Sequence, residues 1–135
     1  MKKKIFKVIA FTMITMGVFY KNVSANELEY VVGKNRYETA AKISDKMSYD
    51  TLILVNGESL ADGLSSSGLS GTLNAPILLT TKDRLPDVTL EKIKTVNKVY
   101  LVGGEGVISK NIENKIRELG KQVIRLSGRD RYLTS

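Results

Sequence analysis

Residues 99–109 read VYLVGGEGVIS, a stretch that predicts a strand, a tight turn and the beginning of a helix. Its first four residues are a continuous apolar run, which fits a strand buried on both faces of a parallel sheet. The glycines favour a turn with a positive φ angle, and Ser109 suits the N-cap of the following helix. The glycine run could instead hold an anion, but it lacks the spacing of a dinucleotide-binding loop and the lysine of a P-loop.

The alternation of strands and helices continues on both sides of this stretch. Comparable apolar runs occupy residues 51–55, 76–80 and 123–126, and residues 30–32 form a shorter candidate strand. Strands that alternate with short helices predict right-handed βαβ units. The predicted fold is therefore an α/β sandwich of three layers, Rossmann-like or flavodoxin-like, with a mainly parallel sheet.

Four helices are predicted between these strands. Asn35 suits the N-cap of the first helix, and Glu38 can complete a capping box. Residues 60–73 are small and apolar, which predicts a buried helix packed close to the sheet. The remaining two helices are predicted to open at Pro86 and after Ser109. Their inward-facing side chains are predicted to be Leu90, Ile93, Ile112, Ile116 and Leu119.

The N-terminal residues predict export. Lysines at residues 2–4 precede a mostly apolar run over residues 5–20, and residues 23–25 supply the small residues that a signal peptidase requires. An uncleaved membrane anchor is the alternative, but the apolar run is short and interrupted for a membrane span. The prediction is a cleaved signal peptide over residues 1–25, a secreted chain at the cell wall or cell surface, and no stable membrane insertion after cleavage.

The net charge of +7 comes largely from that leader. Five of the 21 Lys and Arg residues and none of the 14 Asp and Glu residues precede residue 26, which leaves 16 basic and 14 acidic residues after it. Nucleic-acid binding usually needs a clustered basic face, so nucleic acid is not an expected partner. The chain has no His and no Cys, which excludes a Ser-His-Asp triad, a Cys-His pair and the usual zinc sites. No enzyme activity, metal or cofactor is expected in this chain.

An eight-residue motif occurs twice, with an offset of 95 residues. Residues 33–40 read GKNRYETA and residues 128–135 read GRDRYLTS, so that Gly, Arg, Tyr and Thr are identical in the two copies. A repeat at this spacing indicates one domain-sized module followed by the start of another. The predicted organisation is a first module over residues 26–127 and the start of a second, truncated repeat over residues 128–135.

Candidate binding residues lie near the predicted strand ends, where open α/β sheets place their ligands. Arg36 and its repeat counterpart Arg131 carry planar, permanently charged groups that suit phosphate, although a structural ion pair is the alternative role. Asp62 and Ser65 follow the strand predicted at residues 51–55. Asp62 either hydrogen-bonds a ligand hydroxyl or holds the turn, for instance through an ion pair with Arg36.

Five segments of the chain have a family resemblance when they are taken together. They are GKNRYETA (33–40), NGESLADGLS (56–65), APILLT (75–80), VYLVGGEGVIS (99–109) and VIRLSGRDRY (123–132). In this order and spacing they are similar to the cell wall binding repeat 2 family, over about residues 30–135. Gly63 and Leu133 depart from the alanine and glutamate that are usual in the family.

The resemblance implies a non-catalytic module that anchors an exported surface protein non-covalently to an anionic, phosphate-containing polymer of a Gram-positive cell wall. It also implies further tandem repeats of the same protein, as in surface-layer-associated proteins. The family's anchoring signature corresponds here to Ile77, Leu78 and Leu79, which by their apolar character are predicted to form a central core strand. One alternative is the N-terminal targeting part of a wall-lytic enzyme, such as an N-acetylmuramoyl-L-alanine amidase, with its catalytic domain beyond Ser135. Another alternative is a binding protein for a small ligand.

Overall fold

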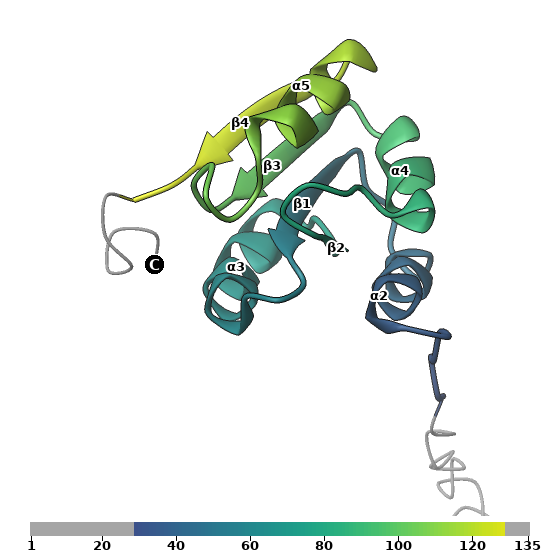
Figure 1. The fold of residues 1–135 in the computed structure, drawn as a ribbon. Helices are drawn as coiled ribbons and strands as arrows, with labels where there is room; N and C mark the ends of the chain where they lie inside the picture. Colours follow the sequence, from purple (N-terminus) through teal and green to yellow (C-terminus); the bar gives the residue numbers. More distant parts are fainter. Residues whose placement is uncertain (1–28, 129–135) are drawn as a thin grey trace, which may run out of the picture. The chain divides into compact units, whose positions relative to one another are not determined.

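The computed structural model describes residues 29–128, in which a parallel sheet lies between helices (Figure 1). The chain divides into two compact units, residues 1–30 and 31–135, and every element described below belongs to the second. The predicted signal peptide and residues 129–135 of the second repeat lie outside the described residues. In chain order the elements are α2 (Arg36–Ser44), β1 (Thr51–Asn56), α3 (Leu60–Leu73), β2 (Ile77–Thr80), α4 (Asp87–Lys94), β3 (Lys98–Val102), α5 (Lys110–Glu118) and β4 (Gln122–Leu126).

The four strands are all parallel and follow the order β2-β1-β3-β4. This order matches the first four strands of the flavodoxin-like arrangement, so the predicted α/β sandwich with a parallel sheet is confirmed. In the centre, Ile53 of β1 pairs in register with Ile77 of β2 on one side and with Tyr100 of β3 on the other. Residues 52–55 are apolar and buried, which explains why β1 takes a central position.

Alternate side chains of the strands enter two separate cores. One face of the sheet packs under α4 and α5, and its core includes Leu78 of β2, Ile93 of α4 and Ile116 of α5. The opposite face packs under α3, where Ile53 and Val55 are buried. The helix α2 contacts the edge strand β2 and α4. The three layers in Figure 1 follow from this division of the side chains.

The N-caps of α2 and α5 lie at the predicted residues, but some of their predicted hydrogen bonds are not formed. Asn35 Oδ1 accepts a hydrogen bond from the Glu38 N–H at 3.0 Å, as expected of an N-cap. The Glu38 carboxylate accepts from the Lys34 N–H at 2.8 Å instead of closing a box on Asn35, and this bond lowers the pKa of Glu38. The helix α5 begins directly after Ser109, but the Ser109 side chain makes no capping hydrogen bond.

The glycine turn after β3 has the predicted positive φ angle. Gly103 has φ +118°, and a Cβ atom at this position would lie 3.0 Å from the Val107 side chain. The Gly103 N–H donates to the Leu126 carbonyl oxygen at 2.8 Å. Because this N–H is already bonded, the structure favours a tight turn over an anion-binding loop.

Three predictions about the ends of elements are wrong. Residues 30–32 form no strand, and Tyr30 and Val32 are mostly exposed, because a short apolar run gains little β-structure without side chains to pack against. Pro86 is the extended N-cap of α4 and not its first helical residue. Leu119 lies after α5 and is exposed, because Gly120 with φ +76° ends the helix at this point.

The predictions of a buried α3 and a central core strand at residues 77–79 are also wrong. β2 is an edge strand in which burial alternates, so that Leu78 is buried while Ile77 and Leu79 are half-buried. In α3 the Leu64 side chain is 65% exposed, and a Cβ atom added at Gly68 would meet nothing within 4 Å. Among residues 29–128, no second helix packs outside α3 on this face, so its outer side is left in solvent.

Candidate functional site

The loops at the carboxyl ends of the strands are the place where α/β folds bind ligands. These loops are residues 57–59 after β1, 81–86 after β2 and 103–109 after β3. Between β1 and β3, the buried Asn56 connects two of them, because its Nδ2 donates to the Val107 carbonyl oxygen at 2.9 Å. This hydrogen bond therefore joins the loops after β1 and β3 at the point where the strand order reverses.

Arg36, the first residue of α2, lies next to these loops. Its Nη1 donates to the Gly57 carbonyl oxygen at 2.7 Å, which connects the repeat motif to the loop after β1. A Cβ atom on Gly57 would lie 3.3 Å from the Tyr37 ring and 3.4 Å from Arg36 Cδ, so glycine permits this close packing. Arg36 remains exposed, and its other guanidinium N–H groups make no hydrogen bond within the described residues.

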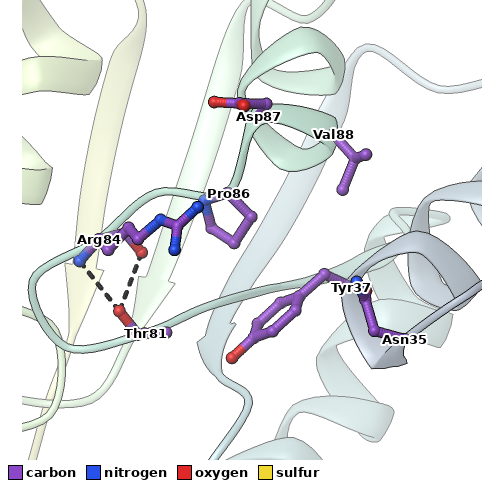
Figure 2. Close-up of a pocket in the computed structure, with 7 residues that line it drawn as sticks. All are labelled: Asn35, Tyr37, Thr81, Arg84, Pro86, Asp87 and Val88. Carbon is purple, nitrogen blue, oxygen red and sulfur yellow. Dashed lines mark hydrogen bonds between the residues drawn. The ribbon is translucent and has the colours of Figure 1, made fainter.

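A hollow of about 290 Å³ lies between the start of α2 and the loop after β2 (Figure 2). Figure 2 shows Tyr37 of α2 on one side of it and Arg84, Pro86 and Asp87 on the other. Thr81 fixes the loop, since its Oγ1 accepts from the Arg84 N–H at 3.0 Å and donates to the Arg84 carbonyl oxygen at 3.1 Å. The lining residues are Asn35, Tyr37, Thr81, Arg84, Pro86, Asp87 and Val88.

The residues of this hollow can bind both a sugar ring and an anionic group. The Tyr37 ring offers an apolar face, and the planar polar groups of Asn35 and Asp87 can exchange hydrogen bonds with hydroxyls. Arg84 can bind an anionic oxygen through a charge-assisted hydrogen bond. Arg36 directly precedes Tyr37 in the chain. A sugar–phosphate unit combines the groups that these side chains recognise.

Asp62 and Ser65 lie on α3, and the predicted ion pair between Asp62 and Arg36 is not formed within the described residues. The Asp62 carbonyl oxygen accepts from Ser65 Oγ at 3.1 Å and from Ser66 Oγ at 2.6 Å. The Asp62 carboxylate lies near the turn after β3, with Oδ2 3.7 Å from the position of a Cβ atom on Gly103. Ser65 lines a different, mainly apolar hollow. The structure therefore does not gather these candidates into one site.

The three residues of the anchoring signature lie in β2 and do not line the hollow next to Tyr37. Leu78 is in the core under α4 and α5, whereas Ile77 and Leu79 pack against the core under α3. Arg131 lies outside the described residues, so its binding role stays a prediction.

Sequence reasoning missed Tyr37, Thr81 and Arg84 as candidate binding residues. Thr81 and Arg84 follow directly after β2, and a polar segment at the end of a predicted parallel strand was the available signal. No local sequence signal indicates that this loop packs beside Tyr37, because Tyr37 and Thr81 are 44 positions apart in the chain. Among residues 29–128, no group of three or more Asp or Glu side chains could hold a metal ion.

A buried carboxylate organises the charges next to the loop after β3. The Glu113 side chain is 4% exposed and lies 2.9 Å from each of Arg125 Nε, Arg117 Nη2 and Lys110 Nζ. Burial alone would raise the pKa of Glu113, but hydrogen bonds from Lys110, Arg125 and Arg117 outweigh it and lower the pKa to about 2. Arg125 Nη1 also donates to two carbonyl oxygens of residues 103–109, so the cluster holds this loop in place.

Comparison with family models identifies the class of protein to which a chain with this fold belongs. The model of Cell wall binding domain 2 (CWB2) matches residues 31–113, more than half of the chain. The chain belongs to this family, so the predicted family is confirmed and the chain is a cell-wall-binding domain. This class implies a location at the cell wall or cell surface. Within the described residues, no helix is long and apolar enough to cross a membrane.

Particular relatives support the same class. The chain is 35% identical over 134 residues to N-acetylmuramoyl-L-alanine amidase LytC of Bacillus subtilis (strain 168), which covers 96% of this chain and 27% of that protein. It is 37% identical over 123 residues to the amidase enhancer of the same organism, covering 87% of this chain and 17% of that protein. The solved structure of Cwp8 from Clostridium difficile superimposes with a TM-score of 0.74 at 38% identity, covering 80% of this chain and 20% of that one. The chain thus spans less than a third of each of these proteins.

Proposed function

We propose that this chain is a non-catalytic module that anchors an exported surface protein to an anionic, phosphate-containing polymer of the cell wall. The observation that carries the proposal is the hollow that Tyr37 and Arg84 line from opposite sides. Arg36, which precedes Tyr37 in the chain, presents a second exposed guanidinium next to the loop after β1. A polymer of sugars and phosphates presents ring faces and negative charges. The Tyr37 ring suits the ring faces, and the arginine side chains suit the phosphates. The attachment is non-covalent, because it uses hydrogen bonds and charge.

Binding by one module is expected to be weak. An exposed ion pair contributes about 0.2–1 kcal/mol in water, so one or two arginines give little affinity. Tandem modules add their contacts through effective concentration. The second copy of the motif at residues 128–135 supports the presence of a further repeat in the same protein. Neither nucleic acid nor stable membrane insertion is part of this proposal.

Arg36→Ala and Arg84→Ala should each weaken retention of the chain on purified cell walls. The loss should be about 1.4-fold to fivefold for each variant, which corresponds to one exposed charge contact. Lys115→Ala is the matched control, because Lys115 is an exposed cation of α5 with no bond in the described structure. The measurement is a pull-down on purified walls, with thermal unfolding of each variant to show that the fold is intact.

Salt provides an independent test of the same contacts. The Debye length falls from about 10 Å at 0.1 M salt to about 3 Å at 1 M, so retention should drop over this range. The drop should be shallower in the Arg36→Ala, Arg84→Ala double variant than in the Lys115→Ala control. Retention that is indifferent to salt and to both arginines would reject an electrostatic anchor.

A second candidate function is the targeting part of a wall-lytic enzyme. The 35% identity to an N-acetylmuramoyl-L-alanine amidase favours it. In this case the chain has the same binding role, and hydrolysis depends on a domain beyond Ser135. A zinc amidase would need His and Glu ligands in that domain. Replacing such a histidine should abolish wall hydrolysis by the complete protein while its retention on walls stays unchanged.

Export should be accompanied by cleavage before Asn26. The basic residues 2–4, the apolar residues 5–20 and the small residues 23–25 support a signal peptide. Mass determination of the secreted protein is expected to show an N-terminus at Asn26. A secreted protein that still carries residues 1–25 would contradict this prediction.

A further inference from the structure

Asn56 is the only asparagine in the chain that is followed by a glycine. Asparagine is a thermolabile residue, because the backbone nitrogen of the next residue can attack its side-chain amide carbon. The cyclic succinimide that forms opens with water to aspartate or isoaspartate. Glycine hinders this attack least, since it has no Cβ atom. The pair Asn56–Gly57 is therefore the position in this chain that is most prone to spontaneous deamidation.

The fold depends on both residues of this pair. Asn56 Nδ2 donates to the Val107 carbonyl oxygen at 2.9 Å, and its Oδ1 accepts from the Glu58 N–H at 2.8 Å, so one amide group fixes the loops after β1 and β3. A Cβ atom on Gly57 would lie 3.3 Å from the Tyr37 ring. Replacing either residue by a less reactive one therefore disturbs the packing at the carboxyl ends of the strands.

The same contacts keep the pair unreactive in the folded chain. The Gly57 nitrogen is engaged, because its N–H donates to the Thr80 carbonyl oxygen at 2.8 Å. The Asn56 side chain is held at both its oxygen and its nitrogen, so it cannot turn toward the Gly57 nitrogen without losing both hydrogen bonds. Asn56 is only 7% exposed and ends β1, which lies between β2 and β3 (Figure 1), so water has little access to it. The reaction therefore requires that these strands and loops separate.

We propose that Asn56 is a modification site that the folded module keeps closed and that unfolding opens to deamidation. In the unfolded chain the Gly57 nitrogen bonds to Asn56 Cγ, and the bond between Cγ and Nδ2 breaks. The Nδ2 group leaves as ammonia with the proton from the Gly57 nitrogen, and water then opens the ring at either carbonyl carbon. Water is the only co-reactant, and nothing is oxidised or reduced. The reaction makes a long-lived unfolding event irreversible.

Neither product can restore the contacts of the parent chain. An ionised aspartate at position 56 presents only acceptor oxygens, so it cannot donate to the Val107 carbonyl oxygen. Isoaspartate lengthens the backbone at the end of β1, where Asn56 pairs with Thr80, and this displaces the Gly57 N–H from its hydrogen bond. Chains that have reacted are therefore expected to refold into a less stable module.

Peptide mapping by mass spectrometry at mildly alkaline pH tests the protection. The 135-residue chain is incubated without urea and in enough urea to unfold it, and the mass increase at position 56 is followed with time. Deamidation should be on the order of a hundredfold or more slower without urea, because only opened molecules react and they are rare. A short peptide of residues 54–61 should react equally fast in both buffers, and Gly57→Ala should slow the reaction in urea. Equal rates at position 56 in the folded and the unfolded chain would overturn the proposal.

Leu78→Ala distinguishes opening by unfolding from a local movement of the loops. The Leu78 side chain lies in the core under α4 and α5 and takes no part in the hydrogen bonds of Asn56. The variant should deamidate on the order of tenfold or more faster than the parent chain without urea, because a larger fraction of its molecules is unfolded. In urea the two rates should be equal, and the half-buried Ile77→Ala should give a smaller acceleration. An unchanged rate for Leu78→Ala without urea would show that unfolding does not control the reaction.

Asn56→Asp reproduces one product of the reaction and tests whether it damages the module. Its denaturation midpoint at neutral pH should be clearly lower than that of the parent chain, because the hydrogen bond to the Val107 carbonyl oxygen is lost. Asn114→Asp is the matched control, since the Asn114 side chain is exposed on α5 and makes no bond within the described structure. The same chemical change there should leave the midpoint almost unchanged. If both variants were as stable as the parent chain, deamidation would not make unfolding irreversible, and this part of the proposal would be wrong.

Discussion

Glu113→Gln is expected to lower the free energy of unfolding by about 3 kcal/mol at pH 7. The pKa of Glu113 falls from 4.5 to about 2 in the folded chain, which corresponds to roughly 3 kcal/mol of stability from its ionised form. Arg125 is only 14% exposed, so removing the carboxylate leaves a largely buried cation without its counter-charge. Such a loss is a large part of the 5–15 kcal/mol that is typical of a domain. Chemical denaturation of the variant and the parent chain gives the measurement.

The same carboxylate predicts a pH dependence of defined sign. Its folded pKa is lowered, so as the pH falls the unfolded chain takes up the proton first. The stability from Glu113 is therefore complete above about pH 4.5 and is lost as the pH falls toward 2. Over this window the difference in stability between the parent chain and Glu113→Gln should shrink.

Glu118→Gln is the matched control, because Glu118 is an exposed carboxylate on the same helix and has no bond within the described structure. Its stability should stay close to that of the parent chain at every pH, since exposed charges contribute little. If Glu113→Gln were as stable as Glu118→Gln at pH 7, the ion pairs of Glu113 with its three cations would contribute nothing to the free energy of unfolding.

The order of strands and helices was predictable because the decisive signals are local. The apolar run of β1 and the turn at Gly103 depend on residues within a few positions of each other. The errors arose where packing decides the outcome. Leu64 and Ile77 look like core residues in the sequence. Within the described part of the chain, however, no other helix shares the face on which α3 lies, and β2 is an edge strand, so both side chains are partly exposed.

The candidate site was less predictable, because it is assembled from distant segments. Arg36 was recognised from its side chain and its motif, but its bond to the Gly57 carbonyl oxygen has no sequence pattern. The hollow requires that α2 pack beside β2 and α4, which brings Tyr37 opposite Arg84. Asp62 and Ser65 are polar residues that follow a predicted strand, which is why they were candidates for binding. The helix, however, directs Ser65 to a different hollow.

The residues of the anchoring signature have different surroundings although they are neighbours in one short strand. Leu78 is completely buried under α4 and α5. Ile77 is half-buried and lines an apolar surface hollow together with Ile43 of α2. Because neighbouring side chains of a strand point to opposite faces, a substitution at one of these residues leaves the surroundings of the other almost unchanged. We therefore expect the contribution of the signature to wall anchoring to act mainly through the fold.

Leu78→Ala should accordingly destabilise the domain by about 2–5 kcal/mol, since it opens a cavity in a core that cannot fully collapse. Ile77→Ala is the neighbouring control and should cost clearly less, because Ile77 already has contact with solvent. Denaturation midpoints of the two variants measure this difference. Under conditions where both variants remain folded, each should be retained on purified walls as well as the parent chain, because neither side chain lines the hollow next to Tyr37. A Leu78→Ala variant that keeps the parent midpoint would show that the side chain is not in the core, and a folded variant that no longer binds walls would assign Leu78 a direct role in binding.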